Sequence, residues 1–425
     1  MSTPIRPSIG PSGIAQVVHG NKAVASASRA RAIDRWLAGR LQRTITPAAL
    51  RLELWDGSSP YDAAVPPAGS LLIRDRRTLI GLVLQPDLQF GESYMDGRLE
   101  VRGPLEPVVE ALTRVSQPHL SWRDRLRLTL PNTLAASRRN VHTHYDLGND
   151  FYQLWLDQNL VYTCAYYANE GMSLDEAQLA KLDLVCRKLR LRPGERVLET
   201  GCGWGALALH MARHYGVHVR AFNISLEQLA FARERAAREG LADRVEFIDE
   251  DYRNVTGRYD AFVSVGMLEH VGLPHLESVA DVLRRTIRPD GGRGLLHFIG
   301  RDVPCPLNAW IRRRIFPGAY TPTVAEVATH TLAPAGMSII DIENLRLHYA
   351  RTLAHWSERF ARVKDRVRQA YGDEFARAWE LYLAGSQAAF ATGWMQLFQI
   401  VFIPRGSTPP SWTRADPYEM PRVAR

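Results

Sequence analysis

The sequence of 425 residues has little cysteine and no long apolar run. It contains 4 cysteines, which are Cys164, Cys186, Cys202 and Cys305. Their spacing fits neither a zinc site nor a disulfide framework, so we expect no metal and a reduced, cytoplasmic setting. No run of eighteen apolar residues occurs, so no membrane-spanning helix is expected. Residues 1–27 are rich in Ser, Gly and Pro and lack an apolar core, which predicts a flexible tail and not a signal peptide.

Acidic residues are also scarce relative to basic ones, at 45 against 53, which gives a formal net charge of +8. This excess predicts an anionic partner. The arginines gather in three segments, each with a tryptophan: 29–43 with Trp36, 123–139 with Trp122, and 312–314 with Trp310. Apolar rings beside cationic side chains suit the headgroup region of an anionic bilayer, so we expect a peripheral membrane association. The alternative is that these segments are ordinary solvated helix faces.

The chain divides into parts with different patterns. Residues 28–113 carry short predicted strands, at 70–74 and 77–84, and form a small α+β amino-terminal domain. Residues 114–140 form a basic connector, 141–405 the main domain, and 406–425 a tail. In the main domain strands alternate with helical patterns, which predicts a doubly wound α/β fold with a mostly parallel sheet. The predicted strands are 196–199, 217–222, 245–248, 261–265 and 294–298.

The most informative motif is an apolar strand that ends in an acid and runs into alternating glycines. The strand ends at Glu199, and the turn that follows contains Gly201 and Gly203. Glycine permits strained dihedrals and a close approach of the backbone to a ligand. A helix is predicted from about Ala206, and its N-terminus favours a nearby carboxylate. The motif indicates a site for an adenine-containing cofactor.

The position of the acid decides which cofactor is expected. A dinucleotide site wants an acid at the end of the second strand, but Asn223 stands there. Glu199 precedes the glycines instead, where it can meet the ammonium group of S-adenosylmethionine. Asn223 and Gln228 can reach the ribose. Asp251 can accept from the adenine amino group with Tyr252 against the ring, although the acids there could simply cap a loop.

The fourth predicted strand end argues against nucleic acid as a partner. Enzymes that methylate base amino groups generally carry Asp or Asn, two prolines and an aromatic residue at this place. The sequence has Gly266, Met267, Leu268, Glu269 and His270 there instead. No groove-reading helix or aromatic-studded sheet is evident either.

Several motifs in order then resemble the cyclopropane-fatty-acyl-phospholipid synthase family over nearly the full length. They are 144–152, 162–166, 201–205, 225–228, 251–253, 264–272, 315–318, 343–344, 348–349 and 352–353. Residues 379–383 and 390–402 resemble the closing helices of that family. Residues 90–97 are similar to the amino-terminal domain of its phospholipid-acting members.

The resemblance implies methyl transfer from S-adenosylmethionine to a cis double bond of unsaturated acyl chains in membrane phospholipid, followed by proton loss that closes a cyclopropane ring. Bicarbonate is the implied base, and its cage maps to Cys164, Glu269, His297, the backbone at Ile299, and Tyr349. The implied cofactor contacts are Tyr162, Thr163, Gly201, Gly203, Asn223, Gln228, Asp251 and Tyr252. Glu199, Thr200 and Asn223 depart from the commonest family pattern but keep hydrogen-bonding capacity.

Related chemistry stays open at this point. The same fold could instead give a methyl-branched or methylene-bearing fatty acid, or methylate a small amine. Aromatic rings can face a cationic intermediate without reacting with it; the candidates are Tyr145, Tyr162, Tyr166, Phe298 and Tyr349. Acyl length, double-bond position and headgroup are not indicated. The oligomeric state is open too, with a homodimer among the alternatives.

Overall fold

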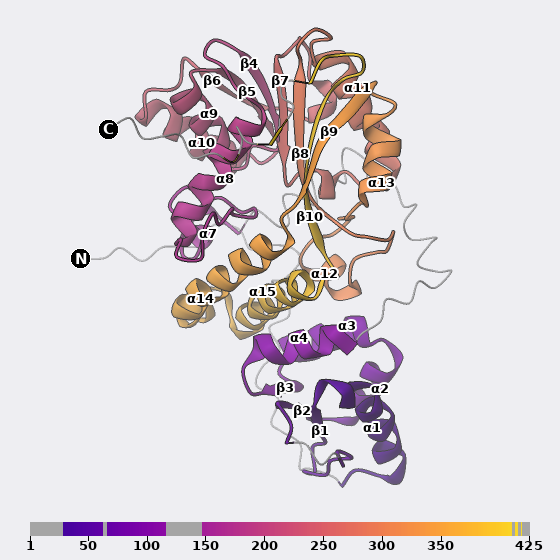
Figure 1. Ribbon diagram of the computed structural model, residues 1–425. Helices are drawn as coiled ribbons and strands as arrows, with labels where there is room; N and C mark the ends of the chain where they lie inside the picture. Colours follow the sequence, from indigo (N-terminus) through magenta and orange to yellow (C-terminus); the bar gives the residue numbers. More distant parts are fainter. Residues whose placement is uncertain (1–28, 63–65, 116–146, 410–412, 415–417, 419–425) are drawn as a thin grey trace, which may run out of the picture.

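The computed structural model describes residues 29–62, 66–115, 147–409, 413, 414 and 418 (Figure 1). These residues form a small unit with a three-stranded sheet and a larger unit built on a seven-stranded sheet. The predicted tail 1–27, most of the predicted connector 114–140, Trp122 and Tyr145 lie outside the described residues.

The small unit is α+β, as predicted. Its elements are α1 (Ala32–Ile45), β1 (Leu50–Glu53), β2 (Gly69–Ile73), α2 (Arg76–Leu84), α3 (Pro86–Met95), β3 (Leu99–Arg102) and α4 (Leu105–Val115). Strand β2 pairs in parallel with β1 and antiparallel with β3. Its core includes the buried side chains of Leu50, Ile73, Leu79, Leu99 and Val108.

One predicted strand of this unit is wrong, because residues 77–84 are part of helix α2. The side chain of Asp75 accepts a hydrogen bond from the backbone nitrogen of Thr78 at 2.7 Å and caps the helix. Thr78, Leu79 and Leu82 are buried, which is helical spacing. The segment contains many branched apolar residues, which favour a strand, so its helical spacing was not recognised.

The large sheet has the order β6-β5-β4-β7-β8-β10-β9. The five predicted strands are confirmed to within two residues at either end; they are β4 (Arg196–Thr200), β5 (His218–Asn223), β6 (Val245–Asp249), β7 (Ala261–Val265) and β8 (Arg293–Gly300). Four parallel pairings join them. Two antiparallel strands complete the edge, β10 (Gln396–Pro404) and β9 (Met337–Asn344). The expectation of a closing helix over 390–402 is therefore wrong beyond Thr392, where α15 ends.

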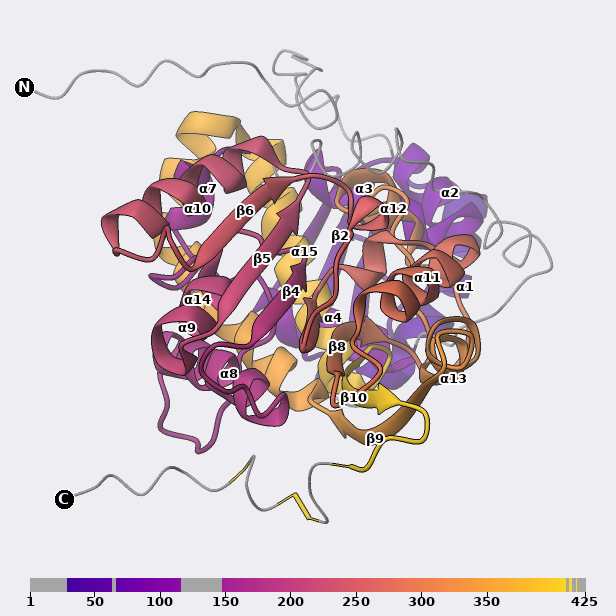
Figure 2. The same cartoon turned by 90° about the horizontal axis from the view of Figure 1, so that it is seen from above.

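Helices cover both faces of the sheet (Figure 2). One apolar core lies between the sheet and α8 (Leu174–Lys188), α9 (Ala206–Tyr215) and α10 (Leu226–Arg238). The other lies between the sheet and α11 (Leu276–Thr286), with α13 (Val324–Val327) and the turn Ala328–Leu332 beside it. Leu295 contributes to the first core and Leu296 to the second, as the alternation of a strand requires.

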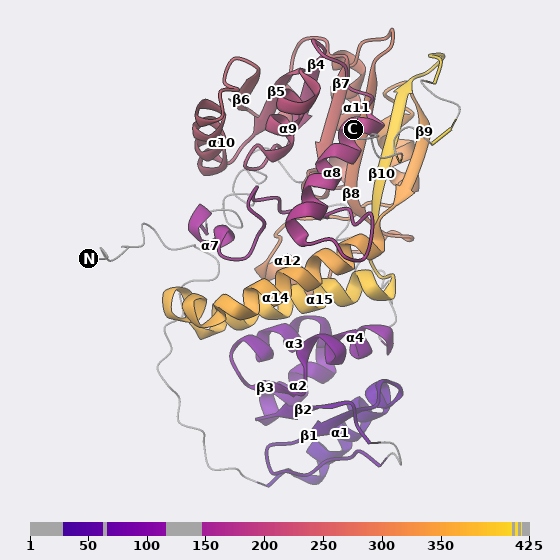
Figure 3. The ribbon, with the colours of Figure 1, turned by 60° about the vertical axis from the view of Figure 1, so that its left-hand side comes forward.

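Two long helices, α14 (Arg346–Tyr371) and α15 (Asp373–Thr392), lie between the large sheet and the small unit (Figure 3). The short helices α7 (Asn149–Gln153) and α12 (Ala309–Arg314) flank them. Helix α4 packs on α15, and α3 packs on α15 and α12. Within the described residues, no helix is long and apolar enough to span a bilayer.

Trp310 belongs to this contact and not to an exposed surface. It is 3% exposed, and its indole nitrogen lies 3.1 Å from the sulfur of Met95. A Cβ placed on Gly91 would lie 2.3 Å from the Trp310 ring, so the indole packs directly on the α3 backbone. The expectation that Trp310 meets a bilayer is therefore wrong, because the ring holds the two units together.

Candidate active site

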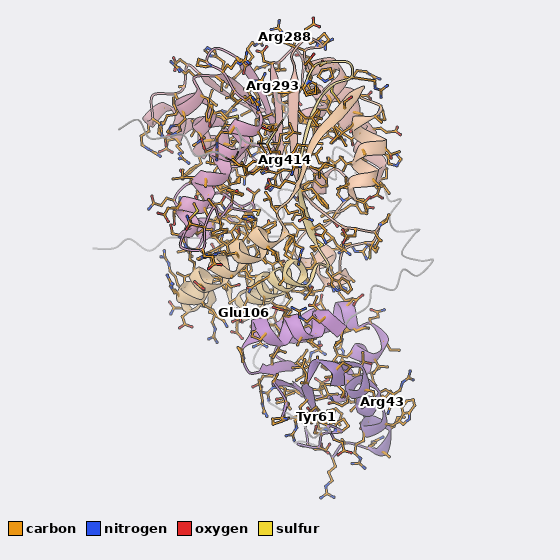
Figure 4. The ribbon with its side chains drawn as sticks, in the orientation of Figure 1. Arg43, Tyr61, Glu106, Arg288, Arg293 and Arg414 are labelled. Atoms are coloured by element: carbon orange, nitrogen blue, oxygen red, sulfur yellow. The ribbon has the colours of Figure 1, made fainter. Side chains whose placement is uncertain are left out.

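The carboxyl ends of β4 and β7 are adjacent at the point where the strand order reverses, which is the usual place for a ligand in such sheets. These ends face α14 and α15. Arg293, the first residue of β8, and Arg288, which precedes the strand, mark the opposite end of the sheet (Figure 4). The glycine loop 201–205 follows β4, and the segment 266–270 follows β7.

The three loop glycines have positive φ but different surroundings. A Cβ on Gly201 would lie 2.9 Å from the Cβ of Met267, and one on Gly205 would lie 2.6 Å from the Phe247 ring. Both glycines therefore permit close packing. A Cβ on Gly203, where φ is +52°, would meet no described residue within 4 Å. Gly203 alone of the three borders open space, so it is the residue that a bound cofactor can approach.

Side chains after β5 brace this loop. Nδ2 of Asn223 donates to the carbonyl oxygen of Gly203 at 3.3 Å and to Oε1 of Gln228 at 2.8 Å. The indole nitrogen of Trp204 donates to Oδ1 of Asn149 at 2.7 Å, which ties the loop to α7. The structure thus brings Asn223 and Gln228 together beside the glycines, where sequence reasoning placed them.

Asp251 is engaged within its own turn. Its carboxylate accepts from the backbone nitrogen of Arg253 at 3.0 Å and from two nitrogens of the Arg253 guanidinium at 2.7 and 2.9 Å. Tyr252 lies beside it, with its hydroxyl 2.9 Å from Oγ of Ser278. The loop-capping role considered for Asp251 is therefore present. Any adenine contact would be additional to it.

Glu199 is buried beside a buried lysine. Oε2 of Glu199 has no hydrogen-bond partner among the described residues. Burial raises the pKa of Glu199 to about 8, although the nearby Lys181 opposes the shift. Burial likewise lowers the pKa of Lys181 to about 8. Nζ of Lys181 donates to Oγ1 of Thr163 at 2.9 Å, which links two predicted cofactor residues to one cation.

Glu269 and Ile299 are in direct contact. The backbone nitrogen of Ile299 donates to Oε1 of Glu269 at 2.6 Å, while Oε2 is buried without a partner in the described structure. Burial raises the pKa of Glu269 to about 7. His297 lies two residues before Ile299 on β8, so both side chains are on the same face. Nε2 of His297 is also buried and unpartnered within the described residues.

Cys164 and Tyr349 belong to the apolar core that reaches the same strand ends. Sγ of Cys164 donates to the carbonyl of Ala165 at 3.1 Å and lies 4.0 Å from that of Leu345. Leu345 donates to the carbonyl of Leu397, and Leu397 is the cross-strand neighbour of Ile299. Tyr349 lies one turn after Leu345 on α14. This path places the predicted anion-site residues around one end of β8 and β10.

The aromatic residues expected to face the cationic intermediate do not all lie on the same side of the sheet. Tyr162 lies in a cluster with Tyr152, Trp155 and Trp356, with ring centroids 5.3 to 5.4 Å from its own. Phe298 points to the opposite face, where it packs on Phe398, so the expectation that it faces the site is wrong. The reason is the strand alternation that brings His297 and Ile299 to the site face.

Sequence reasoning missed two buried lysines of α8, Lys181 and Lys188. They occupy the spacing of the helix's buried face, which also contains Leu174, Ala177 and Leu184. A lysine at an apolar position of an amphipathic helix is a signal that could have found them. Both belong to the helix that covers the sheet face carrying Glu199 and His297. Lys188 donates to Gln399, the cross-strand neighbour of His297.

These features fit the two groups that the sequence implies. Gly203 leaves open space for the methionine part of S-adenosylmethionine, and Glu199 offers a buried carboxylate oxygen to its ammonium. Around the end of β8, Nε2 of His297 and Oε2 of Glu269 lack partners in the part of the chain that the structure describes, and they suit a small anion that carries a proton of its own.

Comparisons with known proteins agree with this geometry. Residues 132–400 match the family model described as mycolic acid cyclopropane synthetase, and residues 40–122 match a domain of unknown function. The chain is 37% identical to a probable fatty acid methyltransferase of Pseudomonas putida, over 87% of this chain and 96% of that protein. It is 38% identical to the cyclopropane-fatty-acyl-phospholipid synthase of Escherichia coli strain K12, over 74% of this chain and 82% of that protein.

A solved structure extends the agreement to three dimensions. The mycolic acid cyclopropane synthase CmaA1, complexed with SAH and CTAB, aligns with a TM-score of 0.59 at 29% identity. The alignment covers 62% of this chain and 97% of that chain.

Proposed function

This chain belongs to the mycolic acid cyclopropane synthetase family of S-adenosylmethionine-dependent lipid methyltransferases, and we propose that it forms cyclopropane rings on the unsaturated acyl chains of phospholipids. S-adenosylmethionine is the methyl donor and supplies an electrophilic methyl group. In the proposed reaction the sulfur–methyl bond breaks as a carbon–carbon bond forms at one alkene carbon. A proton then leaves the added carbon as the ring closes, so the acyl chain gains one CH2.

The observation that carries this proposal is a pair of buried atoms around the end of β8, Oε2 of Glu269 and Nε2 of His297, that have no hydrogen-bond partner among the described residues. Bicarbonate supplies a base when it is held there. His297 would donate to one of its oxygens. Because its pKa is raised to about 7, Glu269 is in part protonated near neutral pH and can share a proton with the anion instead of repelling it. Burial raises the pKa of the Cys164 thiol, so that group stays neutral beside the anion.

The surroundings suit a cationic intermediate, which must be kept from water. Tyr152, Trp155 and Trp356 are buried, and the Tyr162 ring packs against all three. The hydroxyl of Tyr162 lies 2.8 Å from that of Tyr382 on α15, which fixes its ring. Aromatic faces stabilise a positive charge without acting as nucleophiles.

The test uses S-adenosylmethionine with a trideuteromethyl group and vesicles of an unsaturated phospholipid. Ring closure removes one deuteron, so the product should retain two deuterium atoms, and its ring protons should be visible by NMR spectroscopy. A product that retains three deuterium atoms on a saturated branched chain would contradict ring formation.

A methyl-branched or methylene-bearing fatty acid is the second candidate. The relative from Pseudomonas putida, which aligns over 96% of its length, is named only as a probable fatty acid methyltransferase. The same experiment separates these products. A methylene product also retains two deuterium atoms, but ozonolysis cleaves its double bond and leaves a cyclopropane intact. Labelling of added small amines would instead indicate the amine-methylating alternative.

We also propose that the small unit brings the enzyme onto anionic bilayers through α1. Ile33 and Trp36 are each 55% exposed on one face of this helix. The guanidinium of Arg40 lies 5.4 Å from the centroid of the Trp36 ring, and Arg43 continues the same face. The helix has one acid, Asp34, which is buried and paired with Arg76. The exposed charges of α1 are therefore all positive.

Other elements support the same orientation. In Figures 1 and 2, α1, α2 and α12 lie toward one side of the molecule. Leu84 of α2 is 72% exposed, and the side chain of Arg313 of α12 is 61% exposed. Apolar side chains next to cations match the boundary between headgroups and acyl chains.

A further inference from the structure

A ladder of polar side chains crosses the antiparallel edge of the large sheet. The strand register pairs His297 of β8 with Gln399 of β10, and Gln399 with Glu343 of β9. Cross-strand neighbours share a face, so the three side chains form one row. Nε2 of Gln399 lies 3.0 Å from Nδ1 of His297. Lys188, the last residue of α8, donates to Oε1 of Gln399 at 2.6 Å and also donates to Glu343.

The chemistry of these groups fixes the hydrogen positions. A lysine ammonium has only donors, so it must face the oxygen of the Gln399 amide. The amide nitrogen, which also only donates, is then directed at His297. Nδ1 of His297 must therefore accept, and in a neutral ring the hydrogen is on Nε2. That nitrogen is the one left unpartnered within the described residues, on a side chain that is 2% exposed.

The charges that face His297 act in the same direction. Burial lowers the pKa of His297 well below its usual range, and the cations of Lys181 and Lys188 lower it further. The ring is therefore neutral around neutral pH, and within the described part of the chain its hydrogen-bonding contact is with Gln399, which selects the tautomer.

We propose that Lys188 and Gln399 are positioning residues that hold His297 as the neutral tautomer with its hydrogen on Nε2. The candidate anion site then always receives a hydrogen-bond donor at this position. Packing alone does not account for the row, because a buried ion pair such as Lys188–Glu343 is often no more stable than apolar side chains of similar volume. The proposal rests on the proposed function only for the identity of the anion that accepts the hydrogen bond.

The first test observes the tautomer directly. The full chain is labelled with 15N-histidine, and a long-range proton–nitrogen spectrum is recorded between about pH 6 and 8, without substrate. The His297 signals are assigned by their loss in His297→Gln. We expect a neutral ring with its hydrogen on Nε2 throughout. A hydrogen on Nδ1, or a charged ring, would overturn the proposal whatever reaction the enzyme catalyses.

The second test removes the cation that orients the amide. In Lys188→Met, Gln399 is free to rotate, so we expect a mixture of His297 tautomers. The kcat for methyl transfer to vesicles of dioleoyl phosphatidylglycerol should fall at least about tenfold, with affinity for S-adenosylmethionine within about twofold. Lys364→Met is the matched control, because it also removes a lysine ion pair, with Glu380 at 2.6 Å on α14 and α15. It should leave the tautomer unchanged.

Two results of this second test would count against the proposal. One is an unchanged tautomer together with an unchanged kcat in Lys188→Met. The other is an equal change in both lysine variants, which would indicate a general structural effect. If Lys188→Met does not fold, the wild-type spectrum still decides the tautomer. A failure of ring formation would not alter that spectrum, so the two proposals fail separately.

Discussion

At the scale of single residues, the carboxyl groups of Glu199 and Glu269 are buried and have no cation in hydrogen-bonding contact among the described residues. Oε1 of Glu269 accepts from a backbone amide, and its other oxygen has no partner within the described chain. A side chain in this state costs stability when it ionises, because the protein does not replace the lost hydration. Such costs are commonly retained where a ligand or substrate uses the group.

Glu269→Gln is therefore expected to raise stability and lower turnover. The pKa of Glu269 rises from 4.5 to about 7 on folding, which corresponds to a penalty of about 3 kcal/mol once the group is fully ionised. Because the folded state binds this proton more tightly, the penalty is absent below about pH 4.5, grows as the pH rises from 4.5 to about 7, and is complete above about pH 7. Thermal unfolding should show Glu269→Gln more stable than wild type by several degrees at pH 8, and hardly different at pH 4.5.

Activity measurements complete this prediction. The same variant should lose at least about a hundredfold in kcat while binding S-adenosylmethionine normally. Full activity of Glu269→Gln in bicarbonate-depleted buffer would remove this residue from the anion site and assign it to packing.

The glycines after β4 permit a matched comparison. In Gly203→Ala the new Cβ enters the open space that a bound cofactor would occupy, so the two should clash. We expect the affinity for S-adenosylmethionine to fall about tenfold or more, which is at least about 1.4 kcal/mol of binding free energy. The positive φ should cause a small loss of stability. In Gly205→Ala the Cβ meets the Phe247 ring at 2.6 Å, so stability should fall first. Calorimetric titration and thermal unfolding separate the two effects.

Gly57→Ala is the control for backbone strain, because this residue has φ of +79° and nothing within 4 Å, and lies in the small unit. It should lose a similar small amount of stability and keep cofactor affinity. Equal affinities in Gly203→Ala and wild type would mean that the cofactor does not approach this glycine.

At the scale of elements, the sequence predicted what local periodicity encodes. The five parallel strands are apolar runs between helical patterns, and their boundaries differ from prediction by two residues at most. Helix α2 was missed because Ile80 and Val83 suggest a strand, and the cap at Asp75 was not weighed against them. Strand β10 was missed because both of its faces are buried, so it shows no alternation. The left-handed Gly393, which ends α15 just before it, was the available signal.

The site was predictable to the same extent. Strand ends converge by the rules of parallel sheets, so Glu199, Asn223 and Glu269 could be placed from the sequence alone. Lys188 and Gln399 could not be joined to His297 in this way, because that contact depends on the register of an antiparallel strand far along the chain. Cross-strand register of distant segments has no local sequence signal here.

The contact between α3 and α12 gives an element-scale prediction. In Gly91→Ala the new Cβ would lie 2.3 Å from the Trp310 ring, which is held by neighbouring packing, so we expect a loss of about 1 to 3 kcal/mol in stability. Gly39→Ala is the matched control, because Gly39 is inside helix α1 with nothing within 4 Å. There alanine should stabilise by about 0.5 to 1 kcal/mol. Urea unfolding of both variants would check the difference, and a neutral Gly91→Ala would mean that the two helices separate readily.

At the scale of the whole molecule, the small unit and the larger unit share one apolar core. Tyr94, Met95 and Leu105 of the small unit lie in the same cluster as Trp310 and Trp379. Arg314 pairs with Glu92 at 2.6 Å, and the hydroxyl of Tyr94 donates to Glu380 at 3.0 Å. Deleting the small unit would expose this core, so an effect on membrane binding could not be distinguished from a loss of solubility. Surface substitutions on α1 leave the core intact.

Membrane binding is therefore best tested with charge reversals on α1. Arg40→Glu with Arg43→Glu should weaken binding to vesicles rich in phosphatidylglycerol at least about tenfold, because each basic residue near an anionic surface contributes on the order of 1 kcal/mol. Arg238→Glu with Arg288→Glu is the control, since it changes the net charge equally at exposed sites of the larger unit. Trp36 is expected to bury its ring in the bilayer, and salt does not screen this apolar contribution. Trp36→Ser should therefore weaken vesicle binding at both low and high salt. Vesicle flotation at low and high salt measures all four proteins. Equal binding by the two double variants would show that the attraction depends on net charge alone and not on α1. Equal flotation of the wild type on neutral and anionic vesicles would refute the electrostatic argument.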